Sequence, residues 1–213
     1  LRAGVLGAND GIVSVAAIVV GVAGAGSSTA AIVAAGSAAL VGGAISMALG
    51  EYVSVSSQSD SQRALIEKER TELRDDPEGE LAELSALYEA RGLSPHTAQQ
   101  VALELTAKGA LKAHLSMELN IDEADVVSPW HAAGASALAF LIGGILPLLA
   151  ILLTPDTIRV PVTFVVVIAL VVIGALLGGS RPLTATLRVV AGGALALIAT
   201  FAVGTLLGTT GLI

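Results

Sequence analysis

Long apolar runs alternate with short polar connections along most of this chain, and one long polar segment interrupts them. A transmembrane helix needs about 20 consecutive, mostly apolar residues. Five runs have that length, and apart from Asp10 they contain no charged residue; they cover residues 3–25, 30–50, 132–153, 160–179 and 189–213. The pattern therefore predicts an all-α polytopic membrane protein with five transmembrane helices.

The polar segment, residues 60–125, is strongly acidic. It holds fifteen of the eighteen Asp and Glu residues and seven of the eleven Lys and Arg residues, so its formal charge is −8. It cannot lie in hydrocarbon, because one ionised side chain at the bilayer centre costs roughly 2.5 to 3.5 kcal/mol. We therefore expect transmembrane helices 1 and 2 in residues 1–54, an aqueous acidic insert in 55–128, and transmembrane helices 3 to 5 in 129–213.

Helix start signals subdivide this insert. Asp76-Pro77 and Ser94-Pro95 each place a capping side chain before a proline suited to the first helical position. No stop signal follows Glu51, so the second membrane helix is expected to continue into the insert. These signals predict three insert helices, at about residues 55–74, 77–90 and 95–119.

Composition narrows the functional class. The chain is 54% hydrophobic and 14% charged, its mean hydropathy is +0.82, and its formal net charge is −7. Such a balance disfavours nucleic acid as a partner, because its phosphates would be repelled, and favours cations. The absence of Cys excludes disulfides, thiolate metal sites and a cysteine nucleophile. We therefore expect an integral membrane protein that contacts membrane lipid and has cations as partners.

The distribution of Lys and Arg predicts the orientation. With five spans and a cytosolic N-terminus, ten of the eleven basic residues fall on the cytosolic side and only Arg159 falls outside. The short connections alone give three against one in the same direction. The N-terminus and the insert are therefore expected in the cytosol.

Small residues recur at four-residue spacing within the apolar runs, which lets helices approach closely. Two explanations remain open, tight packing inside one subunit and a contact between subunits. The pairs are Gly4 with Ala8, Gly7 with Gly11 and Gly174 with Gly178, together with the small-residue run 191–194.

Carboxylates in the insert recur at helical spacing. Side chains three or four residues apart share one helix face. Two carboxylates about 5 Å apart repel by roughly 3 kcal/mol at an effective dielectric near 20, and a bound divalent cation would remove that cost. Two pairs are Glu69 with Glu72 and Glu80 with Glu83. A third set is His114 with Glu118, and Asp122 joins it if the last insert helix extends that far.

A solvated acidic surface, balanced by Lys68, Arg70 and Arg74, is the simpler explanation for any single glutamate. The recurrence of the pairs on successive helices favours metal, since helical bundles hold iron or manganese with carboxylates from facing helices. Carboxylate and imidazole without thiolate indicate iron(II), manganese or zinc rather than copper(I), and carboxylates alone leave calcium open.

Asp10, Met47 and Glu51 are the informative residues of the apolar runs. An acid inside a membrane helix indicates a functional site by default. A turn at Asp10 would leave residues 12–25, which are too few to span. Met47 and Glu51 lie one helical turn apart and share a face that could meet Asp10. Ordinary packing for Met47, and an interfacial charge for Glu51, are the alternative explanations.

Two ordered motifs carry a family resemblance. Residues 7–14 read GANDGIVS and residues 46–58 read SMALGEYVSVSSQ. They resemble the first two membrane helices of the vacuolar iron transporter family. The similarity covers essentially the whole chain, which resembles a bacterial-type member of that family. It implies a homodimer that exports iron(II), and often manganese, from the cytosol in exchange for protons. The membrane would be the plasma membrane in a bacterium and the vacuolar membrane in a eukaryote.

The resemblance also implies residue roles. Asp10 and Met47 would contact metal on a path at the dimer interface, with Glu51 nearby. The chain departs from the plant-type pattern of Met and Glu at His114 and Leu115. That departure removes one carboxylate, leaves His114 as a candidate ligand and leaves the number of bound metals open. The family's metal-domain glutamates correspond to Glu69, Glu72, Glu80, Glu83 and Glu118.

Two other functions remain open on the sequence. One is a membrane-tethered metal-binding or ferroxidase-like protein, in which the insert does the work. The other is a transporter of calcium or of divalent cations in general. An anchor needs one span and no intramembrane acid, so the five runs and Asp10 favour transport.

Overall fold

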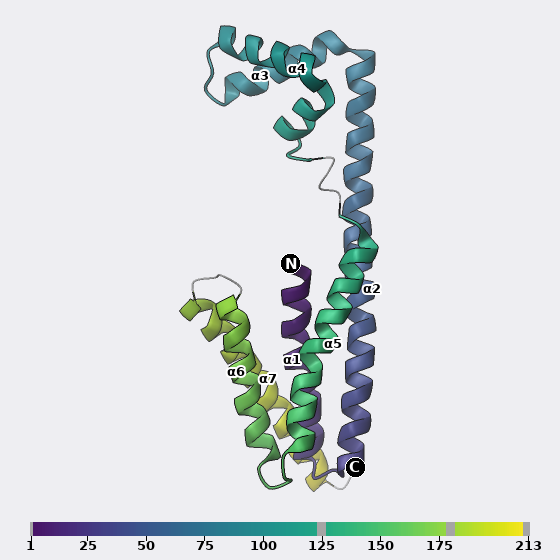
Figure 1. Cartoon of the computed structure of the whole chain (residues 1–213), viewed down its shortest axis with the longest axis vertical. Helices are drawn as coiled ribbons and strands as arrows, with labels where there is room; N and C mark the ends of the chain where they lie inside the picture. The colour runs from purple at the N-terminus through teal and green to yellow at the C-terminus, as the bar shows by residue number, and fades with distance from the viewer. Residues whose placement is uncertain (1, 123–126, 178–181, 211–213) are drawn as a thin grey trace. The chain divides into compact units, whose positions relative to one another are not determined.

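The computed structural model describes residues 2–122, 127–177 and 182–210, and these residues form helices and no strand (Figure 1). The chain divides into two compact units. We call Leu1–Tyr52 with Trp130–Ile213 the apolar unit, and Val53–Pro129 the acidic unit. The helices are α1 (Arg2–Gly24), α2 (Thr29–Asp75), α3 (Pro77–Ala90), α4 (Pro95–Met117), α5 (Pro129–Leu153), α6 (Arg159–Leu177) and α7 (Pro182–Thr209).

Four of the described helices, α1, α2, α5 and α7, are long and apolar enough to cross a membrane. In α6 the segment Arg159–Gly174 is apolar but shorter. The prediction of an all-α integral membrane protein is therefore confirmed, whereas the count of five spans stays a prediction. The predicted end of the fourth span at 179, and Arg181 in the orientation count, lie outside the described residues.

Helix α1 forms the centre of the apolar unit, and Figure 1 shows α5, α6 and α7 running beside it. Val15, Val19 and Val20 of α1 are fully buried. Their methyl groups belong to a core that also contains Phe140, Leu148 and Ile151 from α5, Val167 and Val171 from α6, and Leu197 from α7. This packing fixes the position of α1 against α5, α6 and α7, and therefore also the position of Asp10.

Gly7 and Gly11 let α1 approach α5 closely. A Cβ at Gly7 would lie 2.6 Å from the backbone oxygen of Ser136, and one at Gly11 would collide with the backbone oxygen of Phe140. Packing inside one subunit therefore explains this pair of small residues. No such neighbour surrounds Gly4 or Gly174 among the described residues, and Gly178 lies outside them.

Helix α2 runs without interruption through Asp75, so the predicted continuation past Glu51 is confirmed and no separate helix begins at residue 55. The two predicted caps are also confirmed. The Asp76 carboxylate accepts a hydrogen bond from the N–H of Gly79 at 3.0 Å, and the Ser94 hydroxyl accepts one from Thr97 at 3.4 Å. Side-chain caps and prolines thus determine where α3 and α4 begin.

The predicted helix over about 95–119 is present as Pro95–Met117, but it is kinked. The backbone of α4 leaves helical geometry at Gly109, and Figure 1 shows the change of direction. The helix then ends at Met117, because Asn120 adopts a left-handed conformation with φ 52° and the N–H of Ile121 bonds back to Leu115. Asp122 therefore does not continue the face of His114 and Glu118.

Candidate metal centre

Three residues from three helices of the acidic unit converge on one buried point. Glu69 lies on α2, Glu80 on α3 and His114 on the second segment of α4. The Nδ1 atom of His114 lies 3.0 Å from Oε1 of Glu69 and 3.4 Å from Oε2 of Glu80. One potential ligand atom from each residue lies within 4.8 Å of the others, so a single ion can contact all three.

Burial makes this cluster different from a solvated acidic surface. Glu69 is 2% exposed and His114 is 0% exposed. The contact between them is short, but within the described structure Oε1 of Glu69 and both ring nitrogens of His114 lack an aligned hydrogen bond. A buried polar atom without a partner costs about 1 to 3 kcal/mol. A divalent cation would satisfy Oε1 and one nitrogen at once.

The electrostatics of Glu69 agree with this interpretation. Burial, and then the negative charges of Glu118, Glu80, Glu72 and Glu83, raise the pKa of Glu69 from 4.5 to about 7. Burial also raises the pKa of Glu80, while the nearby His114 opposes that shift. Crowded carboxylates that resist ionisation in this way gain most when a divalent cation arrives.

The other predicted ligands are more exposed to solvent than the three residues of the cluster. Glu72 is half-buried and pairs with Lys68, whose Nζ lies 2.9 Å from its Oε2. Glu83 and Glu118 are exposed, yet their charges reach Glu69. Asp122 is exposed and lies beyond the end of α4. Of the seven predicted residues, the structure thus brings three into contact and places three around them.

Metal binding by this cluster is expected to weaken as the pH falls below about 7, because Glu69 then holds a proton that the metal must displace. One displaced proton corresponds to about tenfold in apparent affinity per pH unit. Calorimetric titration in a series of buffers on both sides of this pH measures the slope. A slope that is the same in Glu69→Gln would contradict the assignment of the proton to Glu69.

In the metal-free protein, the raised pKa of Glu69 also makes the stability of the fold depend on pH. The folded state holds the Glu69 proton more tightly than the unfolded state does. The stabilisation is therefore complete below pH 4.5 and is lost as the pH rises through about 7.

A second candidate site lies within the apolar unit. An open pocket of about 410 Å³ between α1, α2 and α5 is lined by Asp10 and Met47, together with Ser14, Ser46 and Phe140. Asp10 is exposed in the single chain and lies inside an unbroken α1, so the alternative of a turn at this position was wrong. The pocket combines a carboxylate, hydroxyls and a thioether in an otherwise apolar setting.

Glu51, the third residue predicted for the path, is half-buried one turn after Met47 and is not part of the pocket wall. Ser14, Ser46 and Phe140 were not singled out from the sequence. For Ser14 a signal existed, since it follows Asp10 by four residues and shares its helix face. Phe140 gave no such signal, because its place in the wall depends on how α5 packs.

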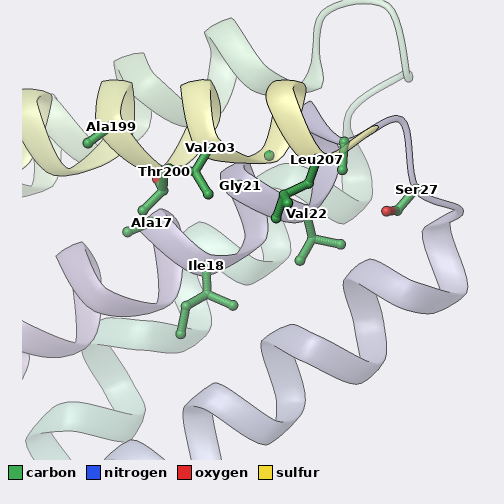
Figure 2. A pocket seen from close by; sticks show the side chains of 11 residues that line it. Ala17, Ile18, Gly21, Val22, Ser27, Ala199, Thr200, Val203 and Leu207 are labelled. Carbon is green, nitrogen blue, oxygen red and sulfur yellow. The ribbon is translucent and has the colours of Figure 1, made fainter. Parts of the chain in front are cut away.

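Another cavity, of about 370 Å³, lies between α1 and α7 (Figure 2). Its wall is almost entirely apolar, with Ile18 and Val22 from α1 facing Val203 and Leu207 from α7. The hydroxyl of Thr200 donates to the carbonyl of Ala196 in its own helix. This cavity therefore presents no charged ligand for a cation, in contrast to the Asp10 pocket.

Comparisons with known proteins give the family. A model of the VIT family matches residues 1–205. A vacuolar iron transporter of Acanthamoeba castellanii is 46% identical over 209 residues, which cover 96% of this chain and 77% of that protein. Vacuolar iron transporter 2 of Oryza sativa subsp. japonica is 32% identical, with 92% and 83% covered. Vacuolar iron transporter homolog 2 of Arabidopsis thaliana is 34% identical, with 100% and 86% covered.

These relatives are named as transporters and not as enzymes, in agreement with the expectation for this chain. The similarity extends over both units and is not confined to the two motifs around Asp10 and Met47. The chain therefore belongs to the VIT family.

Proposed function

We propose that this protein transports iron(II), and also manganese(II), out of the cytosol in exchange for protons. The observation that carries the proposal is the buried cluster of Glu69, Glu80 and His114. Within it, buried atoms of Glu69 and His114 have no hydrogen-bond partner among the described residues, and a divalent cation could bind all three side chains at once. The names of the relatives support iron as the substrate. In this scheme the acidic unit collects metal and the Asp10 pocket carries it.

The donor set favours a transition metal over calcium. Calcium takes six to eight oxygen ligands, whereas imidazole suits iron, zinc and related metals. His114 contributes a buried imidazole, and Met47 contributes a thioether in the membrane pocket. Zinc remains compatible with the same donors. The negative charges of Glu72, Glu83 and Glu118 act on Glu69 and would attract the ion.

Proton exchange is assigned to Asp10. A carboxylate in an apolar helix is costly when it is ionised and unpaired. Asp10 therefore alternates between a metal-bound anion and a protonated neutral form. Departure of the metal is thereby linked to arrival of a proton. Met47 contributes to selectivity, and Glu51 passes ions between the pocket and the cytosol.

The proposed assembly is a homodimer of chains with five spans each, with the N-terminus and the acidic unit in the cytosol. The basic residues support this orientation. The fifth span would be α6, although its apolar segment Arg159–Gly174 is shorter than the other four. The membrane would be vacuolar in a eukaryote and the plasma membrane in a bacterium. A tethered metal-binding protein would use the same acidic unit, but the Asp10 and Met47 pocket has no role in it.

Proteoliposomes that contain the purified protein and a pH-sensitive dye test the proposal. Metal added on the side of the acidic unit is expected to enter the lumen while protons leave it. Metal bound without any transfer across the membrane would instead favour the tethered protein.

Single cysteines introduced at Asp156 and Thr184 are expected to react with an impermeant reagent from opposite sides of the membrane, with Thr184 on the cytosolic side. The reason is the excess of Lys and Arg in the segments assigned to the cytosol. Because the chain has no Cys, each variant carries one label. Reaction of both positions from one side would rule out five spans.

A further inference from the structure

The hydroxyl of Ser14 is hydrogen-bonded to the acid of the membrane pocket. Ser14 Oγ donates to Asp10 Oδ1 at 2.7 Å, from one turn further along α1. Both side chains line the pocket that contains Met47. Among the described residues, the hydroxyl bonded to Asp10 is that of Ser14 alone.

Several threonine hydroxyls in the apolar helices have a different hydrogen-bond partner. A Ser or Thr inside a helix commonly satisfies its hydroxyl on the backbone carbonyl four residues earlier. Three threonines of the described apolar helices do so, at positions 163, 200 and 205. Ser14 has the same spacing to residue 10 but donates to the carboxylate in place of the carbonyl. Its hydroxyl is thus engaged with a pocket group and not with its own helix backbone.

We propose that Ser14 is a positioning residue for metal transport, which rests on the function proposed above. Its hydroxyl holds one oxygen of Asp10 and leaves the other free for an ion in the pocket. Ser14 therefore holds the Asp10 carboxylate in one orientation at the pocket wall. Such preorganisation lowers the cost of binding because the carboxylate does not have to be ordered by the metal.

The pocket offers a matched control. Ser46 lines the same pocket from α2 and loses the same hydroxyl when it is replaced by Ala. Its replacement changes the polarity of the pocket but not the hydrogen bond to Asp10. Ser14→Thr retains a hydroxyl at the same position of α1. The comparison of Ser14→Ala with these two variants separates positioning from pocket polarity.

Initial transport rates in proteoliposomes, measured over a range of iron(II) concentrations, provide the first test. Ser14→Ala is expected to raise the apparent KM about tenfold, the size of one lost hydrogen bond to a charged group, with a smaller change in maximal rate. Ser14→Thr is expected to remain near the wild type, and Ser46→Ala, which lowers the polarity of the pocket but leaves the hydrogen bond to Asp10, is expected to raise the KM less than Ser14→Ala does. Equal effects of Ser14→Ala and Ser46→Ala, or no effect of Ser14→Ala, would overturn the proposal.

Infrared spectra provide a second test that does not depend on transport. The difference between wild type and Asp10→Asn isolates the band of the Asp10 carboxyl group. Ser14→Ala is expected to shift this band and Ser14→Thr to restore it, and an unshifted band would overturn the positioning role. If the wild type moves no metal, the proposed function fails, and the infrared comparison alone decides whether Ser14 positions Asp10.

Discussion

Asp10→Asn is expected to abolish metal-driven proton movement in proteoliposomes while metal binding by the acidic unit persists. Asn retains the shape and hydrogen-bonding capacity of Asp10 but neither ionises nor exchanges a proton. The pocket is otherwise lined by hydroxyls, a thioether and apolar groups, so no second carboxylate of its wall can replace the lost charge. The measurement is the dye signal on addition of iron(II) or manganese(II).

Two further variants calibrate this result. Asp60→Asn removes an exposed acid of the acidic unit and should transport normally. Met47→Ala is expected to cost less than Asp10→Asn, because a thioether is a weak ligand for these ions and mainly affects selectivity. If Asp10→Asn retains its proton flux, Asp10 is structural, and Glu51 becomes the next candidate for the coupling site.

Glu69→Gln is expected to weaken iron(II) or manganese(II) binding by the acidic unit more than any other single change there. Glu69 is the most buried carboxylate of the cluster, and Gln fills the same volume without the charge. Loss of a hydrogen-bond partner of a metal ligand already costs 10- to 100-fold in affinity, so loss of a ligand should cost at least that much. Calorimetry on the full-length protein measures the affinity.

Glu104→Gln is the matched control, since Glu104 is an exposed acid of α4 that does not belong to the cluster. Its affinity should equal that of the wild type. Glu80→Ala with Glu83→Ala is also expected to weaken binding, with the helical circular dichroism signal intact because Ala favours helix. If Glu69→Gln and the wild type bind metal with equal affinity, the glutamates form a solvated acidic surface and not a metal site.

The starts of α3 and α4 were predictable because they depend on local chemistry. Asp76 and Ser94 accept hydrogen bonds from the first turns of α3 and α4, and a proline follows each of them. The continuation of α2 past Glu51 was predictable for the same reason, since nothing nearby could end the helix. The kink at Gly109 was not predictable, because an isolated glycine is tolerated in a helix and its geometry depends on the neighbouring packing.

The sequence by itself determined the helical class, the apolar character of the long helices and the concentration of acid in one segment. Composition and periodicity act within a few turns of chain, so they can be read without knowledge of neighbours. Tertiary structure alone decided which member of each carboxylate pair is buried. Glu69 and Glu72 have the same spacing as Glu80 and Glu83, yet it is Glu69 and Glu80 that meet His114. The physical reason is that two residues three apart share a helix face, and only contact with another helix buries one of them more deeply.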